Sequence, residues 1–111
     1  MASRSYLGNF ELMVLLAVIR LDDAAYGVTI LRTLEAGTGR EVAIGSIYAA
    51  LERLQGKGLV SSRLGEPTPE RGGRAKRYFR VTPDGVREAR STREALSVLW
   101  EGLPQLEGGR A

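Results

Sequence analysis

The chain has 111 residues, of which 43% are hydrophobic and 26% charged, and its formal net charge is +3. This length suits one domain with a single hydrophobic core, and the composition argues against wholesale disorder. The chain contains no cysteine and no histidine, which excludes disulfides, thiolate chemistry and the commonest general base and metal ligand. No acidic loop or paired-carboxylate motif replaces them, so we expect no enzyme, no metal site and no cofactor.

The longest apolar run, Leu12 to Ile19, is eight residues long and too short to cross a bilayer. Glu11 directly precedes it and Arg20 closes it, and no small-residue cleavage site follows. These flanks indicate a buried helix rather than a signal peptide. We therefore expect a cytoplasmic protein without membrane association.

Three helices are predicted in the first half of the chain. Residues 10–21 are nearly continuously apolar, 26–36 show apolar residues at helical spacing, and 44–57 form an amphipathic helix. The apolar stripe of the third helix consists of Ile44, Ile47, Tyr48, Leu51 and Leu54. Its opposite face carries only small, polar or basic residues, namely Gly45, Ser46, Ala49, Arg53, Gly56 and Lys57.

A hairpin follows the third helix. Its strands are predicted at 59–64 and 76–81, and the connection between them is too rich in Pro and Gly for regular structure. In the second strand, Phe79 and Val81 are expected to face the core and to alternate with outward-facing neighbours.

Positive charge is concentrated in this hairpin. From Arg71 to Arg80 there are five basic residues and no acidic one, although the whole chain carries only +3. A local cluster of this kind favours a phosphate backbone as the partner. The structural alternative is a solvated charged loop.

The third helix and the hairpin together suit double-stranded DNA. Small residues on the exposed helix face allow close approach to base edges in the major groove, and Arg53 is long enough to reach a guanine or a phosphate. Tyr48 suits a phosphate hydrogen bond, although a purely structural role fits equally well. Arginines beside a glycine pair suit the minor groove. The predicted DNA contacts are Ser46, Tyr48, Ala49, Arg53, Arg71, Gly72, Gly73, Arg74, Lys76 and Arg77.

A fourth helix is predicted to begin at Thr82-Pro83, a cap residue followed by proline at the first helical position. So small a domain cannot bury the whole apolar seam of this helix while the helix also covers the first helix. The exposed seam predicts pairing with the same helix of a second copy. The alternative is that the seam folds back on its own core. Trp100, the only tryptophan, either fills this interface or lines a pocket for a flat aromatic or apolar effector. The predicted dimerisation residues are Ala89, Leu96, Leu99, Trp100 and Leu103.

Three helices, a hairpin and a final helix make up a winged helix-turn-helix, an α+β and mainly α fold in which the hairpin is the wing. We expect residues 1–82 to form the winged helix DNA-binding domain and 83–106 the C-terminal dimerisation helix. Residues 107–111 are expected to form a flexible tail.

Several short motifs occur in a characteristic order. They are Ala25-Tyr26-Gly27, segment 45–54 of the third helix (the helix expected to read the DNA bases), Lys57-Gly58-Leu59-Val60 and segment 72–79 of the wing. In this order and spacing they make the chain resemble the PadR family of bacterial transcriptional regulators, in particular its smaller subgroup with one short C-terminal helix. The likeness extends from about Leu7 to Leu99.

The resemblance implies a winged helix homodimer joined through the C-terminal helix. It also implies sequence-specific DNA binding, commonly repression that a small ligand relieves. By position, the reading helix of the family is matched by Ser46, Tyr48 and Arg53, and its wing by Arg74, Lys76 and Arg77. Ala43 departs from the family pattern, which often has Ser or Thr as the cap of the reading helix.

These observations lead to two hypotheses. The first is a ligand-responsive repressor that binds a pseudo-palindromic operator as a homodimer. The second is a winged helix protein–protein interaction module whose basic wing docks an acidic partner. Sequence selectivity for DNA distinguishes them, because salt sensitivity is expected of both.

Overall fold

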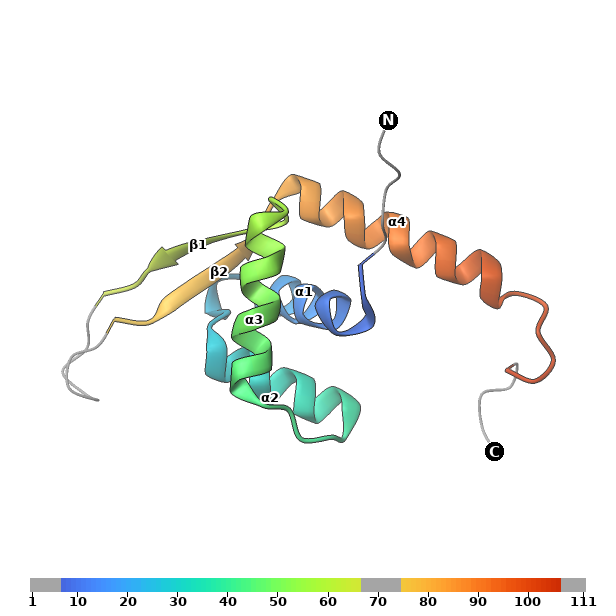
Figure 1. Cartoon of the computed structure of the whole chain (residues 1–111), viewed down its shortest axis with the longest axis horizontal. Helices are drawn as coiled ribbons and strands as arrows, with labels where there is room; N and C mark the ends of the chain where they lie inside the picture. The colour runs from blue at the N-terminus through green and yellow to red at the C-terminus, as the bar shows by residue number, and fades with distance from the viewer. Residues whose placement is uncertain (1–6, 67–74, 107–111) are drawn as a thin grey trace.

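The computed structural model describes residues 7–66 and 75–106. Within them it contains four α-helices and one two-stranded antiparallel sheet. The elements are α1 (Asn9–Leu21), the short 3-10 helix η1 (Asp22–Ala24), α2 (Gly27–Thr38), α3 (Ile44–Gly56), β1 (Val60–Leu64), β2 (Arg77–Val81) and α4 (Pro83–Trp100) (Figure 1). The predicted winged helix order is confirmed, with the first three helices and both strands within two residues of their expected bounds.

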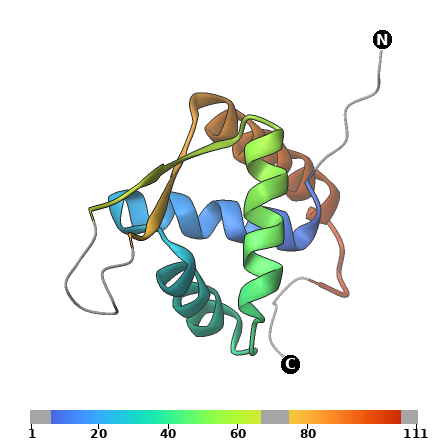
Figure 2. The same cartoon turned by 60° about the vertical axis from the view of Figure 1, so that its left-hand side comes forward.

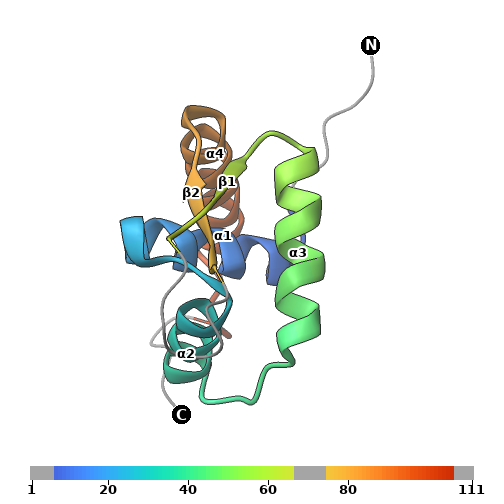
Figure 3. The same cartoon turned by 90° about the vertical axis from the view of Figure 1, so that its left-hand side faces the viewer.

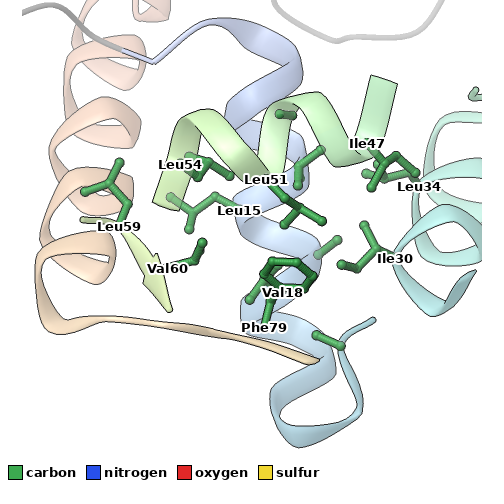
Figure 4. Packing of buried hydrophobic residues seen from close by; sticks show 14 of the residues in the cluster. Leu15, Val18, Ile30, Leu34, Ile47, Leu51, Leu54, Leu59, Val60 and Phe79 are labelled. Carbon is green, nitrogen blue, oxygen red and sulfur yellow. The ribbon is translucent and has the colours of Figure 1, made fainter. Parts of the chain in front are cut away.

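One hydrophobic core lies where α1, α2, α3 and the sheet meet (Figure 4). Helix α1 passes behind α3 (Figure 2) and is covered by several elements, which explains its almost continuous apolar sequence. The largest fully buried side chains are Leu15, Ile30, Ile47, Leu51, Leu54, Val14 and Val18.

The apolar stripe of α3 differs from the prediction. Ala50 is fully buried, whereas Ile44 is 42% and Tyr48 48% exposed. Ile44 and Tyr48 lie four residues apart on one edge of the helix. The neighbouring row of side chains, which includes Ile47 and Leu54, packs into the core. The edge with Ile44 and Tyr48 lies at the border between the core and solvent.

Backbone hydrogen bonds join the two strands of the hairpin to each other and also join the hairpin to the segment between η1 and α2. Val60 pairs with Val81 and Leu64 with Arg77 across the two strands. Beyond this ladder, the Phe79 N–H donates to the Ala25 carbonyl at 2.8 Å. Phe79 is buried and Val81 half-buried, as predicted, so the hairpin is fixed to the helical body by its core-facing side.

Helix α4 begins at the predicted residue but ends at Trp100, before Leu103, the last residue of the predicted apolar seam. The Thr82 hydroxyl accepts from the Gly85 N–H at 3.0 Å, and Pro83 is the first helical residue. Glu101 takes an extended conformation and Gly102 a φ of 75°. Leu103 therefore lies beyond the helix, because a left-handed glycine ends it before the seam completes another turn.

The first half of α4 covers the domain and the second half extends away from it (Figure 1). Ala89 packs against the core, whereas Leu99 is 71% and Trp100 55% exposed. Residues 107–111, predicted to form a flexible tail, lie outside the described residues. None of the described helices combines the length and the apolar content needed to cross a bilayer.

Candidate nucleic-acid interface

Helix α3 stands at one side of the molecule, and its outer surface is open (Figure 3). Ser46, Tyr48 and Ala49 are all exposed. Ala43 precedes the helix without a side-chain hydrogen bond, because alanine has no side-chain acceptor. The first two turns of α3 therefore present Ser46 and Ala49, both small, beside the larger Ile44 and Tyr48. No side chain caps the first backbone N–H groups, which favours an anionic partner such as a duplex.

A groove of about 560 Å³ lies between α3 and the wing. Tyr48 and Ala49 line it from α3, and Arg77 lines it from β2. Three of the predicted DNA contacts thus meet in one place. Glu52 and Gln55, which are not among the predicted contacts, line the same groove. Their carboxylate and amide groups can accept from cytosine or bond to adenine, respectively.

Tyr48 is held by α2 as well as by its own helix. Its ring lies against Gly27, the first residue of α2, where a Cβ atom would come within 2.7 Å of the tyrosine Cζ. Gly27 is buried and Tyr48 is 48% exposed. The ring is therefore fixed on one side and open to the groove on the other.

An aromatic stack lies at the loop end of the two wing strands and consists of Arg63, Tyr78, Tyr26 and Lys76. The two tyrosine rings meet edge to face with centroids 5.3 Å apart. The Arg63 guanidinium lies 4.9 Å from the Tyr78 centroid, and the Lys76 ammonium lies 5.0 Å from the Tyr26 centroid. Exposed cation–π pairs contribute about 0.5–1 kcal/mol each, so the stack orients the wing relative to α2.

Lys76 and Arg77, the two predicted wing contacts that the structure describes, contact different elements. Lys76 contacts Tyr26, whereas Arg77 lies on the α3 side and donates from Nη1 to the Ser62 Oγ at 3.1 Å. The contact of Arg63 with Tyr78 was not predicted from the sequence. The antiparallel register, which pairs these two residues, is the signal that could have predicted it. The other predicted wing contacts, Arg71, Gly72, Gly73 and Arg74, lie outside the described residues.

Arg53 is exposed, as expected, but it is also tied to α1. Its Nε donates to Glu11 Oε2 at 2.5 Å, and the Lys57 Nζ donates to Glu11 Oε1 at 2.8 Å. The hydrogen bond from Lys57, helped by that from Arg53, lowers the pKa of Glu11 against the opposing effect of burial. We call these three residues the Glu11 cluster. No sequence pattern predicts this cluster, because it joins residues of two separate helices.

A second groove, apolar and of about 490 Å³, runs between α1 and α4. Leu12, Leu16 and Ile19 line it from α1, and Ala89, Leu96 and Trp100 line it from α4. The structure thus brings together three of the predicted dimerisation residues. Leu99 does not line this groove, and Leu103 follows the end of the helix.

Solved structures with the same arrangement support the winged helix assignment. A PadR-like regulator from Bacillus cereus is 21% identical with a TM-score of 0.70, and the match covers 91% of this chain and 93% of that one. A PadR-like transcription factor from Bacteroides fragilis is 23% identical with a TM-score of 0.71, over 83% and 84% of the two chains. A PadR family regulator from Eggerthella lenta is 26% identical with a TM-score of 0.67, over 88% and 83%.

A comparison with curated proteins finds no match. The family model described as "Transcriptional regulator PadR-like family" matches residues 15–91, from the middle of α1 into α4. This range includes α3, both strands of the wing and most of the core. The chain therefore belongs to the PadR-like family of transcriptional regulators, and its biochemical class is DNA-binding transcription regulation.

Proposed function

We propose that this chain is a ligand-responsive repressor that binds a pseudo-palindromic operator as a homodimer. The observation that carries the proposal is the groove between α3 and β2, where Tyr48, Ala49 and Arg77 meet on an open face. A repressor of this kind acts by occupying the operator and would work in the cytoplasm, beside the chromosome.

In this proposal α3 reads the major groove. Ser46 and Ala49 let the helix approach the base edges, and Tyr48 binds a phosphate or a base from its position against Gly27. Arg53 contacts the duplex from the later part of the helix. These contacts would select the sequence.

The wing supplies affinity rather than selectivity. Lys76 and Arg77 bind phosphates on either side of β2, because their described contacts place them toward different elements. Arg71 and Arg74, with Gly72 and Gly73 between them, would reach the adjacent minor groove. The charge of this segment predicts a strong salt dependence of binding.

The second half of α4 supplies the dimer interface. Leu96, Leu99 and Trp100 are 43%, 71% and 55% exposed, and the α1–α4 groove beside them is apolar. A second copy of α4 that enters this groove would cover these side chains by two-fold symmetry. Two copies of α3 would then stand about 34 Å apart, one turn of DNA. Residues 83–106 would thus serve dimerisation and 1–82 DNA binding.

A pocket left beside Trp100 between the two subunits would suit a small effector. Trp100 offers an aromatic face, and leucines from both helices offer an apolar wall. A flat aromatic or apolar compound would stack on the tryptophan between the two subunits. Such a ligand would change the spacing of the two reading helices and release the operator.

The proposal is tested by mixing the chain with the DNA upstream of its own gene and measuring affinity and particle mass together. We expect a complex of two chains on one duplex that survives an excess of unrelated DNA. Equal binding to both DNAs would favour the alternative, a winged helix module whose basic wing docks an acidic protein.

A further inference from the structure

The Glu11 cluster connects the helix that carries the proposed reading residues to the helix behind it. Each oxygen of one carboxylate accepts from a different cation, Arg53 at 2.5 Å and Lys57 at 2.8 Å. The Glu11 side chain is only 13% exposed, whereas those of Arg53 and Lys57 are 53% and 48% exposed. The anchor is thus nearly covered, and both cations still face solvent.

The geometry of Arg53 makes this contact directional. A guanidinium has five N–H donors in a rigid plane, and the bond to Glu11 engages the Nε edge. Fixing one edge fixes the plane of the whole group, while the exposed part of the side chain can still approach DNA. A lysine ammonium lacks this property because its donors rotate freely about a flexible stem.

The charge of the cluster is equally relevant. Two cations near the end of α3 would attract any phosphate, whatever the sequence. Glu11 cancels one of these two charges and restrains both side chains. It therefore limits indiscriminate attraction at the end of the helix whose first turns carry Ser46, Tyr48 and Ala49.

We propose that Glu11 is a positioning residue for DNA discrimination, which holds Arg53 in a fixed orientation and keeps Arg53 and Lys57 from binding phosphate indiscriminately. This inference rests on the proposed reading role of α3 and adds a residue of α1 that does not itself touch DNA. Glu11 would contribute little to total affinity and much to the ratio between specific and non-specific affinity.

The test is the substitution Glu11→Gln, which keeps the size of the side chain and removes its charge. Affinity for the selected operator and for a scrambled duplex is measured across a range of salt concentrations. We expect the specific-to-non-specific ratio to fall about tenfold, the order of one lost directional base contact. The salt slope on scrambled DNA should steepen by about 0.9 for each phosphate newly bound.

Glu94→Gln is the matched control, because it removes the same charge from an exposed position on α4. It should change non-specific affinity slightly and leave the ratio unchanged. If Glu11→Gln behaves as this control does, or lowers only the melting temperature while the ratio stays constant, Glu11 has no positioning role.

A second variant, Arg53→Lys, keeps the charge and removes the planar fork. It should lower operator affinity by about tenfold and leave the salt slope unchanged. A wild-type ratio in this variant would contradict the inference without touching the proposed function. By contrast, a wild-type chain that does not distinguish operator from scrambled DNA would overturn both.

Discussion

The phenol ring of Tyr48 in α3 lies directly against Gly27, the residue that begins α2. A side chain at position 27 requires the Tyr48 ring to move, because a Cβ atom there would stand 2.7 Å from the tyrosine Cζ and closer still to its hydroxyl. The absence of a side chain at Gly27 therefore permits the contact that fixes a tyrosine of the reading helix.

Gly27→Ala should separate α2 from α3 or expel the Tyr48 ring. Overpacking of this kind costs about 1–3 kcal/mol, and we expect a loss of this size in urea unfolding. Operator affinity should also fall, because Tyr48 loses its support.

Gly37→Ala is the matched control for this change. Gly37 lies in the same helix and is exposed, and a Cβ atom there meets nothing within 4 Å. Alanine in a helix is more favourable than glycine by up to about 1 kcal/mol, so this variant should be slightly more stable than the wild type. Equal destabilisation by the two substitutions would show that crowding against Tyr48 is not the cause.

The sequence predicts the fold well where local patterns decide it. The three helices, the two strands and the Thr82 cap all depend on neighbours within one or two turns, and all are observed. Local patterns do not predict the border between buried and exposed residues where packing against other elements sets that border. Ile44 belongs to the apolar stripe by periodicity, yet the core leaves it 42% exposed.

The candidate site is predicted in part. The residue types of α3 and the wing predict DNA contacts, but not that Arg77 faces α3 while Lys76 contacts Tyr26. Glu11 meets Arg53 across 42 residues of chain. Such contacts arise only when separate elements pack, so no spacing in the sequence reveals them.

The Glu11 cluster predicts a pH dependence of folding stability. Lys57 and Arg53 hold the pKa of the Glu11 carboxyl below its ordinary value of 4.5. A carboxyl whose pKa is lower in the folded state stabilises the fold above its unfolded pKa and loses that contribution as pH falls through the folded pKa. The contribution should thus be complete at pH 6 and decline below about pH 4.5.

Comparison of wild type with Glu11→Gln in urea unfolding between pH 3 and pH 7 checks this behaviour. The difference in unfolding free energy should be about 0.5–1 kcal/mol at neutral pH, since both cations are half exposed and screened by solvent. It should shrink as the solution becomes more acidic. A difference that grows toward low pH would have the wrong sign for this ion pair.

Leu96→Lys should prevent dimerisation and leave the monomer folded. Leu96 lines the α1–α4 groove and is 43% exposed within one chain, so a charge there disturbs the proposed interface much more than the core. Light scattering should report the mass of one chain. Leu64→Lys, at another exposed leucine in β1, should retain the dimer mass, and a dimer in both variants would place the interface elsewhere.

Arg77→Ala should lower the salt dependence of DNA binding. Loss of one phosphate contact reduces the slope of log affinity against log salt by about 0.9. Arg87→Ala removes the same charge from α4, where Arg87 pairs with Asp84, and should keep the wild-type slope. Titrations at four salt concentrations would detect the difference, and identical slopes for the two variants would remove Arg77 from the interface.

In the proposed complex, two copies of α3 read the two halves of one operator. This arrangement is tested by selection from a library of random duplexes, followed by measurement of the mass of the complex on the enriched sequence. We predict a symmetric site whose halves lie about 34 Å apart, one DNA turn, bound by two chains. No enriched sequence, or an asymmetric site occupied by a single chain, would contradict it.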